Sequence, residues 1–176
     1  MQLRQHLNAV IENIILLLEP SDPVLRKSSL KYVTKTLNML CGEYPMLCFD
    51  QLTQRLVLGG GKDIVIYDLR TATKWRILQG HAANVSAVAV LSTSAQFAIA
   101  SYSAGERSVF AWSFNGGFFG SFLGTHGTVS RKVTLPALAP TSELHVIQMC
   151  SLTWVSPKAV RLAREDGGVI GSILLQ

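Results

Sequence analysis

Apolar residues in the first 18 positions follow a helical spacing. They recur every three or four residues and form one broad face, which predicts an amphipathic helix. These residues are Leu3, Leu7, Val10, Ile11, Ile14, Leu17 and Leu18. Pro20 is expected to end this helix, because proline has no backbone N–H to donate and clashes with the preceding turn.

A second helix is expected to begin directly afterwards. Asp22 precedes Pro23, and a side-chain oxygen just before a proline at the first helical position is a strong start signal. Its predicted inward residues are Leu25, Leu30, Val33, Leu37 and Leu40. Gly42 stands where a left-handed C-terminal cap would fall. The pair resembles one HEAT or armadillo unit, which needs a packed neighbour to bury its apolar sides.

Beyond Pro45 the period of the apolar residues changes from about four to two, which predicts short strands separated by turns. The first four strand candidates are Met46–Phe49, Arg55–Leu58, Ile64–Tyr67 and Trp75–Leu78. The next four are Val85–Val90, Gln96–Ser101, Ser108–Ser113 and Phe118–Leu123. Residues 124–143 contain two prolines and predict an irregular connection. The last candidates are Val146–Val155, Ala159–Ala163 and Val169–Leu175.

Gly80 and His81 form the most informative pair in the chain. They lie between two groups of four predicted strands, and Trp112 ends the third strand of the second group. Tyr67-Asp68 ends the third strand of the first group, at the place of a Trp-Asp dipeptide. This spacing is typical of WD repeats, each of which forms one blade of a β-propeller.

The expected fold class is therefore mainly β with an N-terminal helix pair. We predict a HEAT/armadillo-like α-hairpin over residues 1–44 and a partial propeller of two to three WD-repeat blades over residues 46–176. A complete propeller has about four to eight blades. The blades of this chain are accordingly expected to join the remaining blades of a longer chain.

The WD positions Tyr67, Asp68, Gly80, His81, Ser101 and Trp112 are expected to have structural roles. In WD repeats the histidine hydrogen-bonds to a serine or threonine of the second strand and to an aspartate in the following turn. Ser101 is well placed as the partner on the second strand, and Trp112 is well placed for the outer contact of the network. Glu106 is the only acid in the turn, which predicts a network without its acidic member. The alternative, a catalytic His81, lacks a nearby nucleophile.

Composition adds limits to this interpretation. Of 176 residues, 48% are hydrophobic and 15% charged, which indicates a globular chain rather than a disordered one. The net charge of +5 comes from scattered basic residues with no long run, so nucleic-acid binding is not expected. Lys27, Lys31 and Lys35 share one helix face. They form either a solvated surface or a basic docking strip.

No catalytic, cofactor or metal site is expected. Cys41, Cys48 and Cys150 lack the spacing of a zinc site or a disulfide framework. Gly59-Gly60-Gly61-Lys62 is followed by Asp63 and a predicted strand, unlike a phosphate-binding loop, and predicts a tight turn. With no signal peptide and no long apolar run, we expect a cytoplasmic protein.

The string from Lys62 to Trp75, the following Leu78-Gln79-Gly80-His81, and the ending Val160 to Gly167 are similar to the C-terminal region of the beta rabconnectin family. The order of helix pair, WD repeats and chain end adds to the resemblance, which covers nearly the whole chain. Tyr67 in place of Trp and Ser113 in place of Asp depart from regular repeats.

This resemblance implies a non-enzymatic scaffold. Its implied partners are an alpha rabconnectin-like subunit and subunits of the vacuolar-type proton pump. Its implied role is pump assembly and regulation, and hence acidification of synaptic vesicles and other organelles. Membrane association would be peripheral and only through partners. The alternative is a general WD-repeat adaptor in membrane trafficking or ubiquitin ligase complexes.

Overall fold

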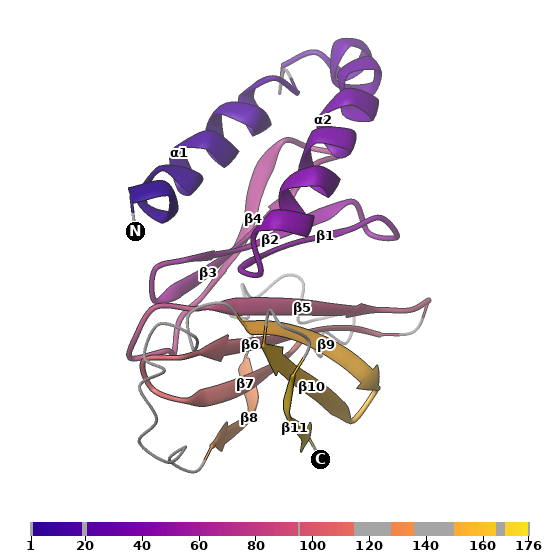
Figure 1. Cartoon of the computed structure of the whole chain (residues 1–176). Coiled ribbons are helices and arrows are strands. Elements are labelled where there is room, and N and C mark those ends of the chain that lie inside the picture. Colours follow the sequence, from indigo (N-terminus) through magenta and orange to yellow (C-terminus); the bar gives the residue numbers. More distant parts are fainter. Residues whose placement is uncertain are drawn as a thin grey trace.

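The computed structural model describes residues 2–18, 21–94, 96–114, 128–135, 150–164 and 168–175. Two helices are followed by three antiparallel sheets (Figure 1). The helices are α1 (Gln2–Leu16) and α2 (Pro23–Glu43). Both lie on the same side of the first sheet.

The start of α2 is confirmed. The Asp22 carboxylate accepts hydrogen bonds from the backbone N–H groups of Val24 at 2.8 Å and Leu25 at 3.1 Å. These N–H groups have no partner within the helix, so the carboxylate satisfies them. Pro23 occupies the first turn, where its missing N–H costs nothing. Pro20 lies outside the described residues.

The end of α2 and parts of both helix faces differ from the prediction. Gly42 is helical, and the cap is Tyr44 with a φ of −123°. Leu25 is 54% exposed and Leu17 is 66% exposed. Val10 is also exposed, whereas Ile15 is buried. The buried stripe is narrower than the apolar stripe because each helix contacts a single sheet.

The first sheet has the strand order β1-β2-β3-β4. Its strands are β1 (Leu47–Asp50), β2 (Arg55–Gly60), β3 (Asp63–Asp68) and β4 (Thr73–Leu78). The four predicted strands are confirmed within one to two residues. The turn at Gly61, with φ +80°, is a conformation that favours glycine, but Gly59 and Gly60 belong to β2 rather than to the turn.

The second sheet has the order β5-β6-β7-β8. Its strands are β5 (Ala87–Ser92), β6 (Phe97–Ser103), β7 (Ser108–Ser113) and β8 (Thr128–Thr134). The fourth strand, β8, lies within the predicted irregular connection of residues 124–143, so that prediction is wrong for residues 128–134. The predicted strand at 118–123 lies outside the described residues.

The third sheet has the order β11-β10-β9. Its strands are β9 (Cys150–Ser156), β10 (Ala159–Arg164) and β11 (Val169–Leu174). The three predicted strands are confirmed over these residues, and residues 146–149 lie outside the described part of the chain.

The first strands of the three sheets lie beside one another, β1 next to β5 and β5 next to β9. Hydrogen bonds cross between the sheets there: the N–H of Val88 donates to the Pro45 carbonyl at 2.8 Å, and Trp154 Nε1 donates to the Ala89 carbonyl at 3.2 Å. Each sheet then extends outward from this inner line. Sheets stacked around inner strands define the blades of a partial β-propeller.

The three sheets, stacked side by side, form an arc, and three separate apolar clusters of the described residues hold the arc and the helices together. The helices cover the outer face of the first sheet, with Ile11, Leu18 and Leu37 buried against Leu56 and Leu58. We call the contact between the first and second sheets the first junction; it contains Val57, Ile64, Ile66, Leu78, Val85, Val88, Ile99, Phe110 and Trp112. We call the contact between the second and third sheets the second junction; it contains Ala87, Ala89, Ala100, Tyr102, Val109, Cys150, Leu152, Val160, Leu162 and Ile173.

Candidate functional site

His81 is a buried ionisable side chain at the first junction, next to the Phe110 and Trp112 rings. It lies between β4 and β5, and its side chain is fully enclosed. Its Nε2 lies 2.7 Å from the Ser101 hydroxyl oxygen, on β6. The same oxygen accepts a hydrogen bond from Trp112 Nε1, on β7, at 2.8 Å. The Ser101 hydroxyl on β6 therefore connects His81, which precedes β5, with Trp112 on β7 of the second sheet.

The other ring nitrogen of His81 contacts a carboxylate. Nδ1 hydrogen-bonds to Glu106 Oε1, and Glu106 Oε2 accepts from the backbone N–H of Ala82 at 3.3 Å. The prediction that this network lacks its acidic member is therefore wrong. Glutamate is one methylene longer than aspartate, and Glu106 reaches the histidine from the turn between β6 and β7.

This geometry determines the histidine tautomer. A carboxylate only accepts, so Nδ1 carries the proton and donates it to Glu106. Nε2 then accepts from the Ser101 hydroxyl, which in turn accepts from Trp112. Burial lowers the pKa of His81 below its ordinary value, while Glu106 opposes this effect. The imidazole is therefore neutral near pH 7, with both nitrogens satisfied.

Gly80 lies close to the aromatic rings that surround His81. A Cβ on Gly80 would lie 3.1 Å from Trp112 Cη2 and 3.2 Å from Phe110 Cε2. The Phe110 ring stacks on the imidazole, with centroids 4.1 Å apart and planes inclined by 21°. The two aromatic rings thus fill the space that a side chain at position 80 would need.

Tyr67 and Asp68 lie on β3 of the first sheet and do not join this network. The Tyr67 hydroxyl lies 3.5 Å from Glu12 Oε1 of α1. Asp68 accepts from Arg70 Nε at 3.0 Å and from Arg70 Nη2 at 2.6 Å. Burial alone would raise the pKa of Asp68, but the hydrogen bonds from Arg70 hold it below its usual value. The structure thus groups Gly80, His81, Ser101 and Trp112, and leaves Tyr67 and Asp68 apart.

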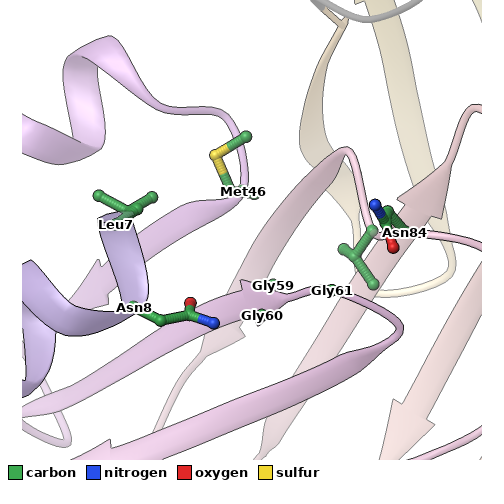
Figure 2. Close-up of a pocket in the computed structure, with 8 residues that line it drawn as sticks. Leu7, Asn8, Met46, Gly59, Gly60, Gly61 and Asn84 are labelled. Atoms are coloured by element: carbon green, nitrogen blue, oxygen red, sulfur yellow. The ribbon is translucent and has the colours of Figure 1, made fainter. Parts of the chain in front are cut away.

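A pocket opens beside this region, between α1 and the first two sheets (Figure 2). It has a volume of about 300 Å³. Its lining residues are Leu7, Asn8, Met46, Gly59, Gly60, Gly61, Asn84 and Val85. None of these side chains titrates near neutral pH, so the pocket offers amide hydrogen bonds and apolar contact but no acid or base.

Gly59, in β2, lies in close contact with Val85, in the segment that leads into β5, and both residues line this pocket. A Cβ on Gly59 would lie 2.8 Å from Val85 Cγ1. The glycine therefore permits the contact between β2 and the segment that enters β5.

The cysteines offer little nucleophilic character. Burial raises the pKa of Cys41 to about 12 and also raises the pKa of Cys48 and Cys150. A thiol with so high a pKa carries little thiolate at neutral pH. Within the described ranges, no three His, Cys, Asp or Glu side chains gather as a metal site would require. Neither described helix has the length and apolar content that a bilayer span demands.

The three sheets define the class of this protein as a partial β-propeller preceded by two helices. No protein-family model matches the chain, and no curated protein sequence matches it. Among solved structures, 39 chains match. One is the β-propeller domain of Cps50 (Swd1) from Myceliophteria thermophila, with 18% sequence identity and a TM-score of 0.42. The match covers 76% of this chain but only 37% of that one.

Proposed function

We propose that this chain is a non-catalytic protein-interaction scaffold built from WD-type blades. One observation carries the proposal: a chain of hydrogen bonds joins Glu106, His81, Ser101 and Trp112 and gives both nitrogens of the buried histidine a partner within the fold. The structure does place a nucleophile beside His81, the Ser101 hydroxyl, and a serine, a histidine and an acid are linked in this order in catalytic triads. Here, however, Ser101 is 0% exposed and its oxygen also accepts from Trp112, so the network supports a structural role for the histidine. In this proposal the exposed surfaces of the blades bind partner proteins, as they commonly do in β-propellers.

The domain division belongs to the same proposal. Residues 1–44 form the helical part and residues 46–176 the blades. Tyr67, Asp68, Gly80, His81, Ser101 and Trp112 take structural WD-repeat positions. Further blades of a longer chain would complete the ring.

The sequence resemblance supports a more particular role. We place the chain with the beta rabconnectin family, as a cytoplasmic partner of an alpha rabconnectin-like subunit. In that role it supports assembly and regulation of the vacuolar-type proton pump, and so vesicle acidification. Contact with vesicle membranes would be peripheral and through these partners. The second candidate, a general adaptor in trafficking or ubiquitin ligase complexes, is favoured only by the fold.

The test is affinity capture with the tagged full chain from brain cytosol. We expect recovery of the alpha rabconnectin-like subunit and of pump subunits, identified by mass spectrometry. A matched variant, Trp112→Ala, perturbs the first junction and should reduce their recovery. Recovery of ubiquitin ligase or coat components without pump subunits would support the adaptor instead. Recovery of neither set, by a folded chain, would overturn the scaffold proposal.

A further inference from the structure

Two arginines and a tryptophan form a cluster at the end of the first junction opposite to His81. The Arg55 guanidinium carbon lies 3.6 Å from the centroid of the Trp75 ring, and that of Arg76 lies 4.8 Å from it. Next to them, the rings of Phe97, in β6, and of Phe114, directly after β7, have centroids 6.1 and 5.5 Å from that of Trp75. We call Arg55, Trp75 and Arg76 the arginine–tryptophan cluster.

A β-bulge creates this arrangement. In the pairing of β3 with β4, Ile66 lies opposite Arg76 and Tyr67 opposite Lys74, which leaves Trp75 as the extra residue. Side chains normally alternate between the faces of a strand, but a bulge interrupts the alternation and redirects a side chain. Trp75 and the adjacent Arg76 consequently point to one face, toward Arg55.

Neither arginine of the cluster forms a salt bridge within the described part of the chain. Burial lowers the pKa of Arg55, although the Asp68 and Asp50 carboxylates act on it electrostatically and oppose this effect. In β2, Arg55 lies directly opposite Asp68 of β3 on one side and opposite Asp50 of β1 on the other. However, the Asp68 oxygens accept from Arg70, and the Asp50 oxygens accept from Leu52 and Thr53. Arg55 Nε is buried without a hydrogen-bond partner. An unsatisfied buried donor is unfavourable, and more so when it is charged.

Joining two blades does not require such a cluster. In the second sheet the same bulge occurs in β8, where Trp112 lies opposite Val129 and Ala111 opposite Arg131. By register, Ala98, Ser130 and Arg131 stand at the second junction where Arg55, Trp75 and Arg76 stand at the first. The second junction therefore forms with an alanine at the position of Arg55 and a serine at the position of Trp75.

We propose that the arginine–tryptophan cluster binds an acidic segment of a partner protein, through its aspartate or glutamate carboxylates. Arginine pairs with carboxylates in a fork of two hydrogen bonds, and a flanking aromatic ring holds the guanidinium in place. All three residues are half-buried, and tryptophan and arginine are the side chains most enriched at the energetic centres of protein interfaces. This inference rests on the scaffold function proposed above and names the chemistry of one partner surface.

The direct test uses the full chain and a fluorescein-labelled octaglutamate peptide at constant ionic strength, followed by fluorescence anisotropy. We expect saturable binding, and at least about a tenfold weaker affinity for Arg76→Gln, which corresponds to about 1.4 kcal/mol. Arg131→Gln is the matched control. It removes the same charge at the corresponding position of the second junction and should change the affinity less than about twofold.

Arg55→Met is the second variant, because methionine keeps much of the apolar stem while removing the charge. Urea unfolding establishes that each variant is folded before binding is measured, and Arg76→Gln carries the test if Arg55→Met unfolds. Equal weakening by Arg76→Gln and Arg131→Gln would overturn the proposal, since attraction would then be general. Equal binding of an octaglutamine peptide would overturn it too.

The failure of this inference is separable from the failure of the scaffold function. If octaglutamate does not bind but the chain still captures its named partners, the cluster is not the docking surface and the scaffold stands. If neither occurs, both fail.

Discussion

The two junctions of this molecule solve the same packing problem with different side chains. The first contains Trp112, Phe110 and a buried hydrogen-bonded histidine. The second contains the small side chains of Ala87, Ala89 and Ala100 on the second sheet, against Leu152 and Leu162 on the third. Among the described residues, its two large rings are Tyr102 and the partly buried Trp154, and no histidine network joins them. Large rings with polar handles need defined partners, whereas alanines allow close approach with few constraints. The first junction is thus the more specific and the more sensitive to change.

The largest expected effect comes from removing the central ring of the first junction. Trp112 is 1% exposed, and Trp112→Ala should lower the free energy of unfolding by about 3–5 kcal/mol. Val109→Ala, on the same strand but facing the second junction, should cost roughly 2 kcal/mol. Urea unfolding followed by circular dichroism measures both. Equal losses would remove the distinction between the junctions.

Adding a methyl group should separate the tight position from an open one. Gly80→Ala places a Cβ within 3.2 Å of the Phe110 and Trp112 rings and should destabilise the chain by about 1–3 kcal/mol. Gly171→Ala, in β11, meets no atom within 4 Å and should change stability by less than about 0.5 kcal/mol. Thermal unfolding of the two variants beside the parent chain provides the measurement. A neutral Gly80→Ala would contradict the close packing described at this position.

A smaller effect should appear with pH. Because the pKa of His81 is lower in the folded chain than in the unfolded chain, the unfolded state binds more protons as the pH falls below about 6.5. Stability from this group is complete above that pH and declines below it, by at most about 1.4 kcal/mol per pH unit. Urea midpoints measured from pH 7.5 to pH 5 should show this decline.

His81→Gln provides the comparison for the pH effect. It should be less stable at pH 7.5, but its stability should depend less on pH over the same range. A parallel decline in both chains would show that other groups, and not the first junction, determine the acid sensitivity.

Most strands could be predicted because they are short apolar runs bounded by turn residues. In β2, β6 and β7 consecutive residues are buried, so both faces of these strands are covered. The run Ile64-Val65-Ile66, which follows the turn at Gly61, is an example. The strand β8 was missed because its sequence, Thr-Val-Ser-Arg-Lys-Val-Thr, is mostly polar. It lies at the outer edge of its sheet, where little apolar surface is buried, and nearby prolines favoured an irregular segment.

The site was predictable only in part. Ser101 and Trp112 lie at positions that the strand spacing brings near His81, and the structure places both against it. Glu106 is the only acid of its turn, but the WD pattern has an aspartate there, and sequence spacing does not show how far the longer glutamate side chain reaches. The arginine–tryptophan cluster could not be predicted at all, since it depends on an extra residue in one strand pairing that only the register reveals.

The helices on the first sheet give the arc a direction. Ile11, Leu18 and Leu37 occupy the face of the first sheet against which another sheet would otherwise pack. A blade can pack at that end only if both helices leave the first sheet and uncover Leu56 and Leu58. A further blade can be added beside the third sheet without that cost, but closing a complete ring would require the helices to move. Ring closure and the packing of the helices on the first sheet are therefore mutually exclusive.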